Sequence, residues 1–291
     1  MRRRLFLVAS GLAPLPARAG PAPVQAVASF SILADMLHQI GGDQVTVISV
    51  VPAEGDAHGY QPRPADARAV MAARLLVVNG LGLDSWMLRL ARSAEFKGVT
   101  AIATEGVKPR TLPNAKAIDP HAWQDPRNGA LYAALIGNGL AAADPANAET
   151  YRASAARYAA EIRDVDTWIA SQFAPIPPAA RRIITTHDAF GYFGARFGIQ
   201  FLAAQGLSTE AEPSAKAIAA LVAQIKREKI RAVFVENMTD PRLAQMLMRE
   251  TGAILGGTVY SDALSGPTGP AATYLDMLRH NTDLFAAAMR G

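Results

Sequence analysis

The chain has 291 residues, with 29 Lys and Arg against 25 Asp and Glu, and it contains no cysteine. Four arginines (Arg2, Arg3, Arg4 and Arg18) lie near the N-terminus, where there is no acidic residue, so the rest of the chain has no net excess of base. No basic run with interleaved aromatic residues follows, which argues against nucleic acid as a partner. The absence of cysteine excludes disulfides and thiolate metal ligands.

Residues 1–19 have the features of an export signal. A basic start is followed by an apolar stretch at 5–15 and by Ala17-Arg18-Ala19, which fits the small-residue cleavage rule. An apolar stretch of about eleven residues is too short to span a bilayer, which takes roughly 20, and no later segment has such a run without charges. We therefore expect a soluble periplasmic protein that starts at Gly20 and carries no lipid anchor on an N-terminal cysteine.

The first half of the remaining chain alternates strand and helix patterns. Short β-branched or apolar runs at 24–29, 45–51, 75–78 and 99–103 are typical of buried parallel strands. A helical pattern at 32–40 ends at Gly41-Gly42, and another at 127–142 closes this half. Residues 20–143 are therefore predicted to form an N-terminal α/β lobe.

A long helix is predicted next. Asp144-Pro145 reads as an N-cap followed by proline at the first helical position, and prolines from Pro175 onward end the helix. About 28 residues would span roughly 42 Å, so we assign 144–173 to a rigid connector between two lobes. Apolar residues recur at helical spacing through this segment, at Tyr151, Ala155, Tyr158, Ile162, Val165 and Ile169.

The second half of the chain again alternates strand and helix patterns. Strand patterns at 182–186, 200–203, 231–235 and 254–259 are interleaved with helical patterns at 190–197, 213–228, 240–251 and 270–289. Residues 174–291 are therefore predicted to form a C-terminal α/β lobe. The expected fold is α/β, with two lobes, each a parallel sheet flanked by helices, joined by one long helix.

Four residues in short polar turns are candidate metal ligands: His58, His121, His187 and Asp262. Ligands of open α/β sheets bind beyond the carboxyl ends of the strands; three of these residues follow predicted strands, and the fourth precedes the helix at 127. Two come from each half, which places a cation between the lobes. Three imidazoles and a carboxylate suit a divalent cation of intermediate softness, zinc above all. Taken singly, however, each histidine fits an ordinary surface position and Asp262 fits a helix N-cap.

The motifs around these residues resemble those of a known family. They include residues 29–35, residues 55–66 with Asp-Ala-His and Pro-Arg-Pro-Ala-Asp, residues 78–82, 119–123, 186–192, 212–214 and 260–264. In this order they resemble the solute-binding proteins of bacterial ABC transporters for zinc, manganese and related metals. The resemblance implies two α/β lobes joined by one long helix, and its four metal-ligand positions map onto His58, His121, His187 and Asp262.

The resemblance also implies a function and partners. The protein would be a periplasmic binding protein, not an enzyme, that delivers metal to an ABC permease with its ATPase. A monomer is expected, and loading by a periplasmic metallochaperone stays open. In the family the third ligand varies between histidine and glutamate. His187 here favours zinc over manganese, which prefers oxygen donors, but manganese remains the alternative. Residues 104–118 contain no histidine, so one ion per chain is expected.

The other functions that such residues could serve are those of a secreted zinc hydrolase and of a metal-dependent adhesin or periplasmic zinc store. A secreted zinc hydrolase would keep an open coordination position and a general base, and no His-Glu-x-x-His motif is present; a periplasmic zinc store would use the same ligands. Glu236, Asp125 and Asp188 are candidates for orienting an imidazole through its other nitrogen. His38 and His280 fall in helical patterns and are expected to be solvated.

Overall fold

The structure is a computed structural model that describes residues 22–111, 117–210 and 212–290. The predicted signal at 1–19 lies outside the described residues, as does part of the loop at 104–118. No helix in the described part of the chain is long and apolar enough to cross a membrane.

The N-terminal half contains one parallel sheet with strand order β2-β1-β3-β4. Buried apolar side chains dominate its two central strands, as expected for a sheet covered on both faces. A short antiparallel hairpin of β5 and β6 leads from this sheet toward the second half. The elements are β1 (Val24–Phe30), α1 (Ser31–Gly41), β2 (Val45–Val51), α2 (Pro64–Ala72), β3 (Leu75–Val78), α3 (Ser85–Ser93), β4 (Val99–Ile102), β5 (Arg110–Thr111), β6 (Ile118–Asp119) and α4 (Pro126–Ala143).

The C-terminal half repeats the plan with strand order β10-β9-β7-β8, again parallel throughout. The elements are β7 (Arg182–His187), α6 (Gly191–Phe197), β8 (Gln200–Gln205), α7 (Ala215–Glu228), β9 (Ala232–Glu236), α8 (Arg242–Thr251), β10 (Ile254–Val259) and α9 (Tyr274–Arg290). Single 3-10 turns occupy Gly42–Gln44, Ala122–Gln124, Pro145–Asn147 and Pro178–Ala180. The predicted α/β fold with two parallel sheets is confirmed.

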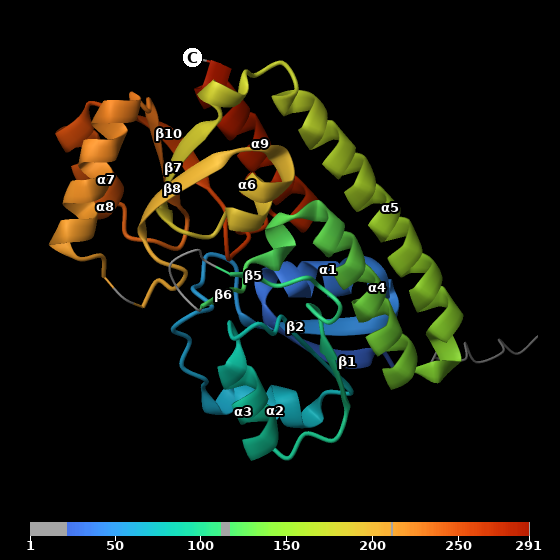
Figure 1. Cartoon of the computed structure of the whole chain (residues 1–291). Coiled ribbons are helices and arrows are strands. Elements are labelled where there is room, and N and C mark those ends of the chain that lie inside the picture. The colour runs from blue at the N-terminus through green and yellow to red at the C-terminus, as the bar shows by residue number, and fades with distance from the viewer. Residues whose placement is uncertain (1–21, 112–116, 211, 291) are drawn as a thin grey trace, which may run out of the picture.

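The long helix is α5 (Ala148–Phe173), which runs along one side of the molecule past both halves (Figure 1). It begins three residues later than predicted, because Pro145–Asn147 forms a 3-10 turn. Asp144 does not cap α5: its carboxylate accepts hydrogen bonds from Asn147 Nδ2 (2.7 Å) and Tyr151 Oη (2.9 Å) and so fixes the turn.

Helix α5 is fastened to both halves. It packs along α4 and contacts α9, and Arg196 of α6 forms a bidentate ion pair with Asp166 of α5 (2.9 and 2.7 Å). One continuous cluster of buried apolar residues extends from β1 through α5 to α9. The two halves therefore share a core, and α5 is a rigid part of it.

Other helix starts were also predicted too early, among them those of α7 and α9. Ser214 Oγ accepts from Ala217 N (3.2 Å), so α7 begins after that cap and not at Pro213. Similarly, Thr273 Oγ1 accepts from Asp276 N (3.1 Å), and α9 begins at Tyr274 instead of Pro270. Side-chain caps at these two positions override the proline signal.

Candidate metal centre

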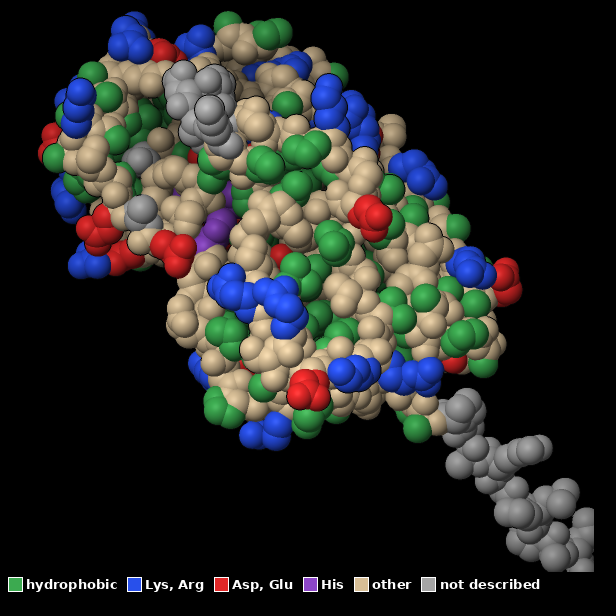
Figure 2. Space-filling view, turned by 60° about the horizontal axis from the view of Figure 1, so that its bottom comes forward, with side chains coloured by type: hydrophobic (Ala, Val, Ile, Leu, Met, Phe, Trp, Pro, Cys, Tyr) green, Lys and Arg blue, Asp and Glu red, His purple; other side chains and the backbone are tan. Residues whose placement is uncertain are grey.

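The four predicted ligand residues converge between the two halves. Each offers one donor atom, and these atoms lie within 4.8 Å of one another. His58 follows β2, His121 follows β6, His187 is the last residue of β7, and Asp262 follows β10. In space-filling view, histidine side chains are visible at the bottom of the hollow between the halves (Figure 2). The parallel sheets thus bring together residues that are far apart in sequence.

The spacing of the donor atoms suits a small cation. His58 Nε2 is 3.1 Å from Asp262 Oδ2 and 3.3 Å from His121 Nε2. His187 Nε2 is 3.3 Å from Asp262 Oδ2, and His121 Nε2 is 3.5 Å from Oδ1. A tetrahedral ion with bonds of about 2.0–2.1 Å has donors about 3.3 Å apart. These four separations match that geometry.

An Asp-x-His turn places His58. Asp56 Oδ1 accepts a hydrogen bond from the backbone N–H of His58 (2.8 Å), and Asp56 Oδ2 accepts from Thr209 Oγ1 of the C-terminal half (2.5 Å). The side chain of His58 is 6% exposed, whereas those of the other three residues are fully buried. His58 therefore forms the solvent side of the centre.

A second Asp-x-His turn places His121. Asp119 Oδ1 accepts from the backbone N–H of His121 (3.0 Å) and from its Nδ1 (2.7 Å), which leaves the lone pair of Nε2 facing the centre. Asp119 Oδ2 accepts from Arg110 Nη1 (2.8 Å). Gly191 lies against this ion pair, and a Cβ there would collide with the guanidinium of Arg110.

Glu236, the last residue of β9, holds His187. Its carboxylate pairs with His187 Nδ1 and also accepts from the backbone N–H of His187 (2.8 Å) and from Thr186 Oγ1 (2.7 Å). Carboxylates that orient a metal-binding imidazole in this way fix its tautomer and raise its basicity. Glu236, one of the candidates from the sequence, thus contacts the ring of His187, and its role in orienting a metal ligand stays a prediction.

The sequence interpretation missed Asp119 and was wrong about two other acids. Asp125 caps α4 and pairs with Arg127 (Oδ2 to Nη2, 2.6 Å), so it does not orient His121. Asp188 does not hold the ring of His187, because Glu236 occupies its Nδ1; burial raises the pKa of the Asp188 carboxyl group. The available signal for Asp119 was the Asp-x-His pattern it shares with residues 56–58.

Asp262 is held through its neighbour. The carbonyl oxygen of Ser261 accepts hydrogen bonds from Trp123 Nε1 and Gln124 Nε2 (2.8 Å each), which lie in the N-terminal half. The residues directly after Asp262 are not helical, so Asp262 is not an N-cap. Both its carboxylate oxygens are buried and accept no hydrogen bond among the residues that the structure describes. They face the imidazoles, and a cation there would satisfy them.

The two remaining histidines lie outside the centre. His38 is exposed on α1, as predicted. His280 on α9 is half-buried: its Nε2 donates to the carbonyl oxygen of Thr258 (2.9 Å), and its ring packs against Tyr260. It has a local structural role instead of being simply solvated.

The protonation of the buried histidines in the centre depends on the neighbouring carboxylates, and the pKa of Asp262 depends on those histidines. Burial by itself lowers the pKa of His121, but the carboxylates of Asp262 and Asp119 outweigh it and raise the pKa to about 9. Burial likewise lowers the pKa of His187, and Glu236 and Asp262 reverse the direction. Burial raises the pKa of Asp262, but His121 and His187 outweigh this and lower it. The raised pKa values of His121 and His187 favour protonated rings beside the buried carboxylates.

Binding of a cation should therefore release protons. The raised pKa of His121 means that its protonation stabilises the metal-free fold fully below about pH 6.5 and that this contribution is lost as the pH rises through about 9. We expect metal affinity to rise with pH over the same window, because ligation requires neutral imidazole. Calorimetry at pH 7.5 in buffers of different ionisation enthalpy measures the protons released; heats that do not depend on the buffer would contradict the prediction.

Comparison with known proteins identifies a family and similar sequences. Residues 26–288 match the family described as zinc-uptake complex component A, periplasmic. The manganese-binding lipoprotein MntA of Halalkalibacterium halodurans is 33% identical over 263 residues, which cover 90% of this chain and 87% of that protein. The iron-binding protein YfeA of Yersinia pestis is 32% identical over 264 residues, or 89% of this chain and 84% of that one.

Solved structures share the fold over nearly the whole chain. A manganese-bound mutant of a periplasmic metal binding protein from Candidatus Liberibacter asiaticus superposes with a TM-score of 0.84 at 30% identity, covering 91% of this chain and 98% of that one. The periplasmic zinc binding protein TroA of Treponema pallidum gives 0.87 at 25% identity, covering 92% and 99%. The chain belongs to the zinc-uptake component A family, the metal-binding substrate-binding proteins of ABC transporters.

Proposed function

We propose that His58, His121, His187 and Asp262 bind one zinc ion in the periplasm and that the protein delivers this ion to an ABC permease and its ATPase. The observation that carries the proposal is the convergence of three imidazoles and one carboxylate, whose donor atoms lie within 4.8 Å of one another. Four of the separations are 3.1–3.5 Å, close to those expected for tetrahedral zinc. The ion is cargo, so the site must both bind and release it.

The environment of the centre supports cargo binding over catalysis. Four protein ligands fill a tetrahedral shell and leave no position for an activated water. The carboxylates that contact the imidazoles, Asp119 and Glu236, are engaged by ring and backbone N–H groups, so neither is free to act as a general base. We infer that the protein is a carrier and not an enzyme.

Manganese is the second candidate cargo, and one feature favours it. Asp262 Oδ1 faces His121 while Oδ2 faces His58 and His187, so both oxygens point toward the same space. Bidentate ligation by this carboxylate would give five donors, which suits the higher coordination number that manganese prefers. Relatives named for manganese and for zinc are both similar to this chain.

Competitive titration of the metal-free protein with zinc and manganese, followed by elemental analysis, tests the proposal. One equivalent of zinc, bound in preference to manganese, is expected. Preferential binding of manganese would show that manganese, the second candidate, is the cargo instead of zinc. Failure to bind either ion, or hydrolysis of ester or peptide substrates by the zinc-loaded protein, would contradict the carrier function itself.

The choice between the two metals should depend on His187. Replacing it with glutamate adds a second carboxylate and a further oxygen donor at the end of β7. We expect His187→Glu to lower the ratio of zinc to manganese affinity at least about tenfold, or roughly 1.4 kcal/mol. Competition titrations measure this ratio, with His38→Ala on the exposed face of α1 as the control. An unchanged ratio in His187→Glu would show that another residue selects the metal.

A further inference from the structure

Of the four proposed ligands, His58 is the least firmly held. The rings of His121 and His187 each have a buried carboxylate on Nδ1, from Asp119 and Glu236. No carboxylate on the Nδ1 of His58 is found in the described part of the chain. His58 is also the ligand with solvent exposure, at 6%. Its position therefore depends on the loop that carries it, residues 52–58, rather than on contacts of its ring.

This loop, which we name the clamp loop (residues 52–58), reaches across to three separate loops of the C-terminal half. Glu54 Oε2 accepts from Asn237 Nδ2 after β9 (2.9 Å), and Glu54 Oε1 accepts from Gly266 N after β10 (3.2 Å). The backbone N–H of Glu54 donates to Leu264 O (3.0 Å). Asp56 Oδ2 accepts from Thr209 Oγ1 after β8. One N-terminal loop thus bridges the loops that follow three of the four C-terminal strands.

The backbone at Glu54 indicates that its side chain matters. Glu54 has a φ of 62°, in the left-handed region that glycine adopts without steric cost and other residues do not. Glycine would form this turn more readily. The chain instead places here the carboxylate that contacts two opposite loops, and strain of this kind is retained where the surrounding contacts determine it.

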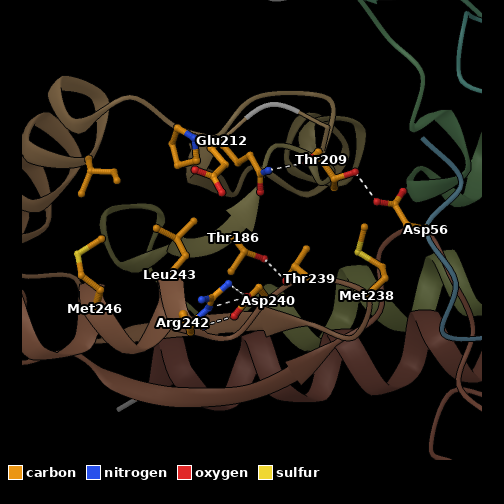
Figure 3. A pocket seen from close by; sticks show the side chains of 13 residues that line it. Asp56, Thr186, Thr209, Glu212, Met238, Thr239, Asp240, Arg242, Leu243 and Met246 are labelled. Atoms are coloured by element: carbon orange, nitrogen blue, oxygen red, sulfur yellow. Dashed lines mark hydrogen bonds and ion pairs between the residues drawn. The ribbon is translucent and has the colours of Figure 1, made fainter. Parts of the chain in front are cut away.

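Solvent reaches the other side of the clamp loop. A cavity of about 530 Å³ is lined by Asp56 and Thr209 together with residues of the C-terminal half, among them Glu212 and Met238. In close-up, the hydrogen bond between Asp56 and Thr209 spans one end of this cavity (Figure 3). Water can therefore compete for that contact, whereas the contacts of Asp119 and Glu236 are buried.

We propose that Glu54 and Asp56 are positioning residues that hold His58 on the bound ion, and that release begins when their contacts to the C-terminal loops break. The proposal rests on the metal-binding function above. On this proposal the contacts close over an ion that has already entered, so they act mainly on its dissociation, which is where most differences in affinity among related complexes arise.

Two variants break the contacts without altering a ligand. Thr209→Val is nearly isosteric and removes the donor to Asp56 Oδ2 while the turn from Asp56 to His58 N is kept. Glu54→Gly removes the carboxylate but suits the left-handed backbone, so the metal-free protein should unfold at the same temperature or higher. Glu54→Gln keeps an acceptor for Gly266 and is the conservative variant. Thr251→Val is the matched control, because Thr251 Oγ1 donates within α8, to Leu247 O.

Stopped-flow mixing of zinc-loaded protein with saturating EDTA measures release, and mixing of metal-free protein with zinc measures association. We expect release to be about fivefold faster in Thr209→Val and in Glu54→Gly, and about 25-fold faster in the double variant. Association should change by less than about twofold, Glu54→Gln should restore most of the wild-type rate, and Thr251→Val should match wild type.

Three results would overturn the proposal: a double variant that releases zinc at the wild-type rate, an equal acceleration in Thr251→Val, or equal increases in association and release. The last would describe a gate that does not position His58. These outcomes are distinguishable from failure of the proposed function, because the wild-type protein must first bind one equivalent of zinc. A wild type that binds no zinc would contradict the function itself.

Discussion

Replacing Asp262 with asparagine should weaken zinc binding by about a hundred-fold to a thousand-fold. Four-ligand zinc sites bind with about 10–16 kcal/mol, or about 2.5–4 kcal/mol per ligand. Asp262 is also the one anionic group among the four proposed ligands, and it faces all three imidazoles. The asparagine side chain has the same shape but supplies no charge to neutralise the cation. Competition against a chelator of known affinity measures the change.

The control for this substitution is Asp240→Asn. Asp240 lines the cavity beside the centre but pairs with Arg242 on the exposed side (2.7 Å). Its loss should leave the zinc affinity within about twofold, because exposed charges contribute little through solvent. Comparable losses in both variants would mean that zinc responds to the general acidity of the cleft, and Asp262 would then not be a ligand.

Saturating zinc should raise the thermal stability of the whole chain in one step. An ion at 1,000 times its dissociation constant adds about 4 kcal/mol to the free energy of unfolding. For a chain of this size this corresponds to a shift of roughly 10 °C. The ligands come from both halves, and the apolar core is continuous between them. Calorimetric scans with and without zinc should therefore each show a single transition.

Two thermal transitions, of which only one moves with zinc, would contradict this prediction. That result would place the bound ion within one half of the molecule. His121→Ala, from the N-terminal half, and His187→Ala, from the C-terminal half, provide the comparison: each should remove most of the zinc-induced shift.

The fold could be predicted from the sequence because its parallel strands are short apolar runs separated by amphipathic helices. The candidate ligands could be predicted for a related reason, since three of them lie at or after the carboxyl ends of such runs. The beginning of α5 could not be predicted in this way. Asp144 meets the sequence criteria for an N-cap, but its carboxylate accepts hydrogen bonds from the side chains of Asn147 and Tyr151 instead. Local sequence patterns do not reveal which of several nearby donors will form hydrogen bonds with a given side chain.

The residues that contact the candidate ligands could be predicted from the sequence only in part, for the same reason. Glu236 could be suggested because it ends a strand next to the β7 strand that carries His187. The contact between Asp119 and Arg110 could be predicted only from the pairing of β5 with β6. These two strands are too short to show a periodic pattern in the sequence. The contacts of Glu54 join residues more than 180 positions apart. They depend on how the two halves face each other, which no sequence window contains.

If the protein delivers metal as proposed, the shared core limits how a permease could distinguish a loaded carrier from an empty one. Rotating one half away from the other would separate α5 from α9 and Arg196 from Asp166, and each 100 Å² of apolar surface exposed would cost about 2.5 kcal/mol. The outline of the molecule should therefore be nearly the same in both states. The difference that a docking partner can sense is then concentrated at the mouth of the cleft, in the few hydrogen bonds around the clamp loop.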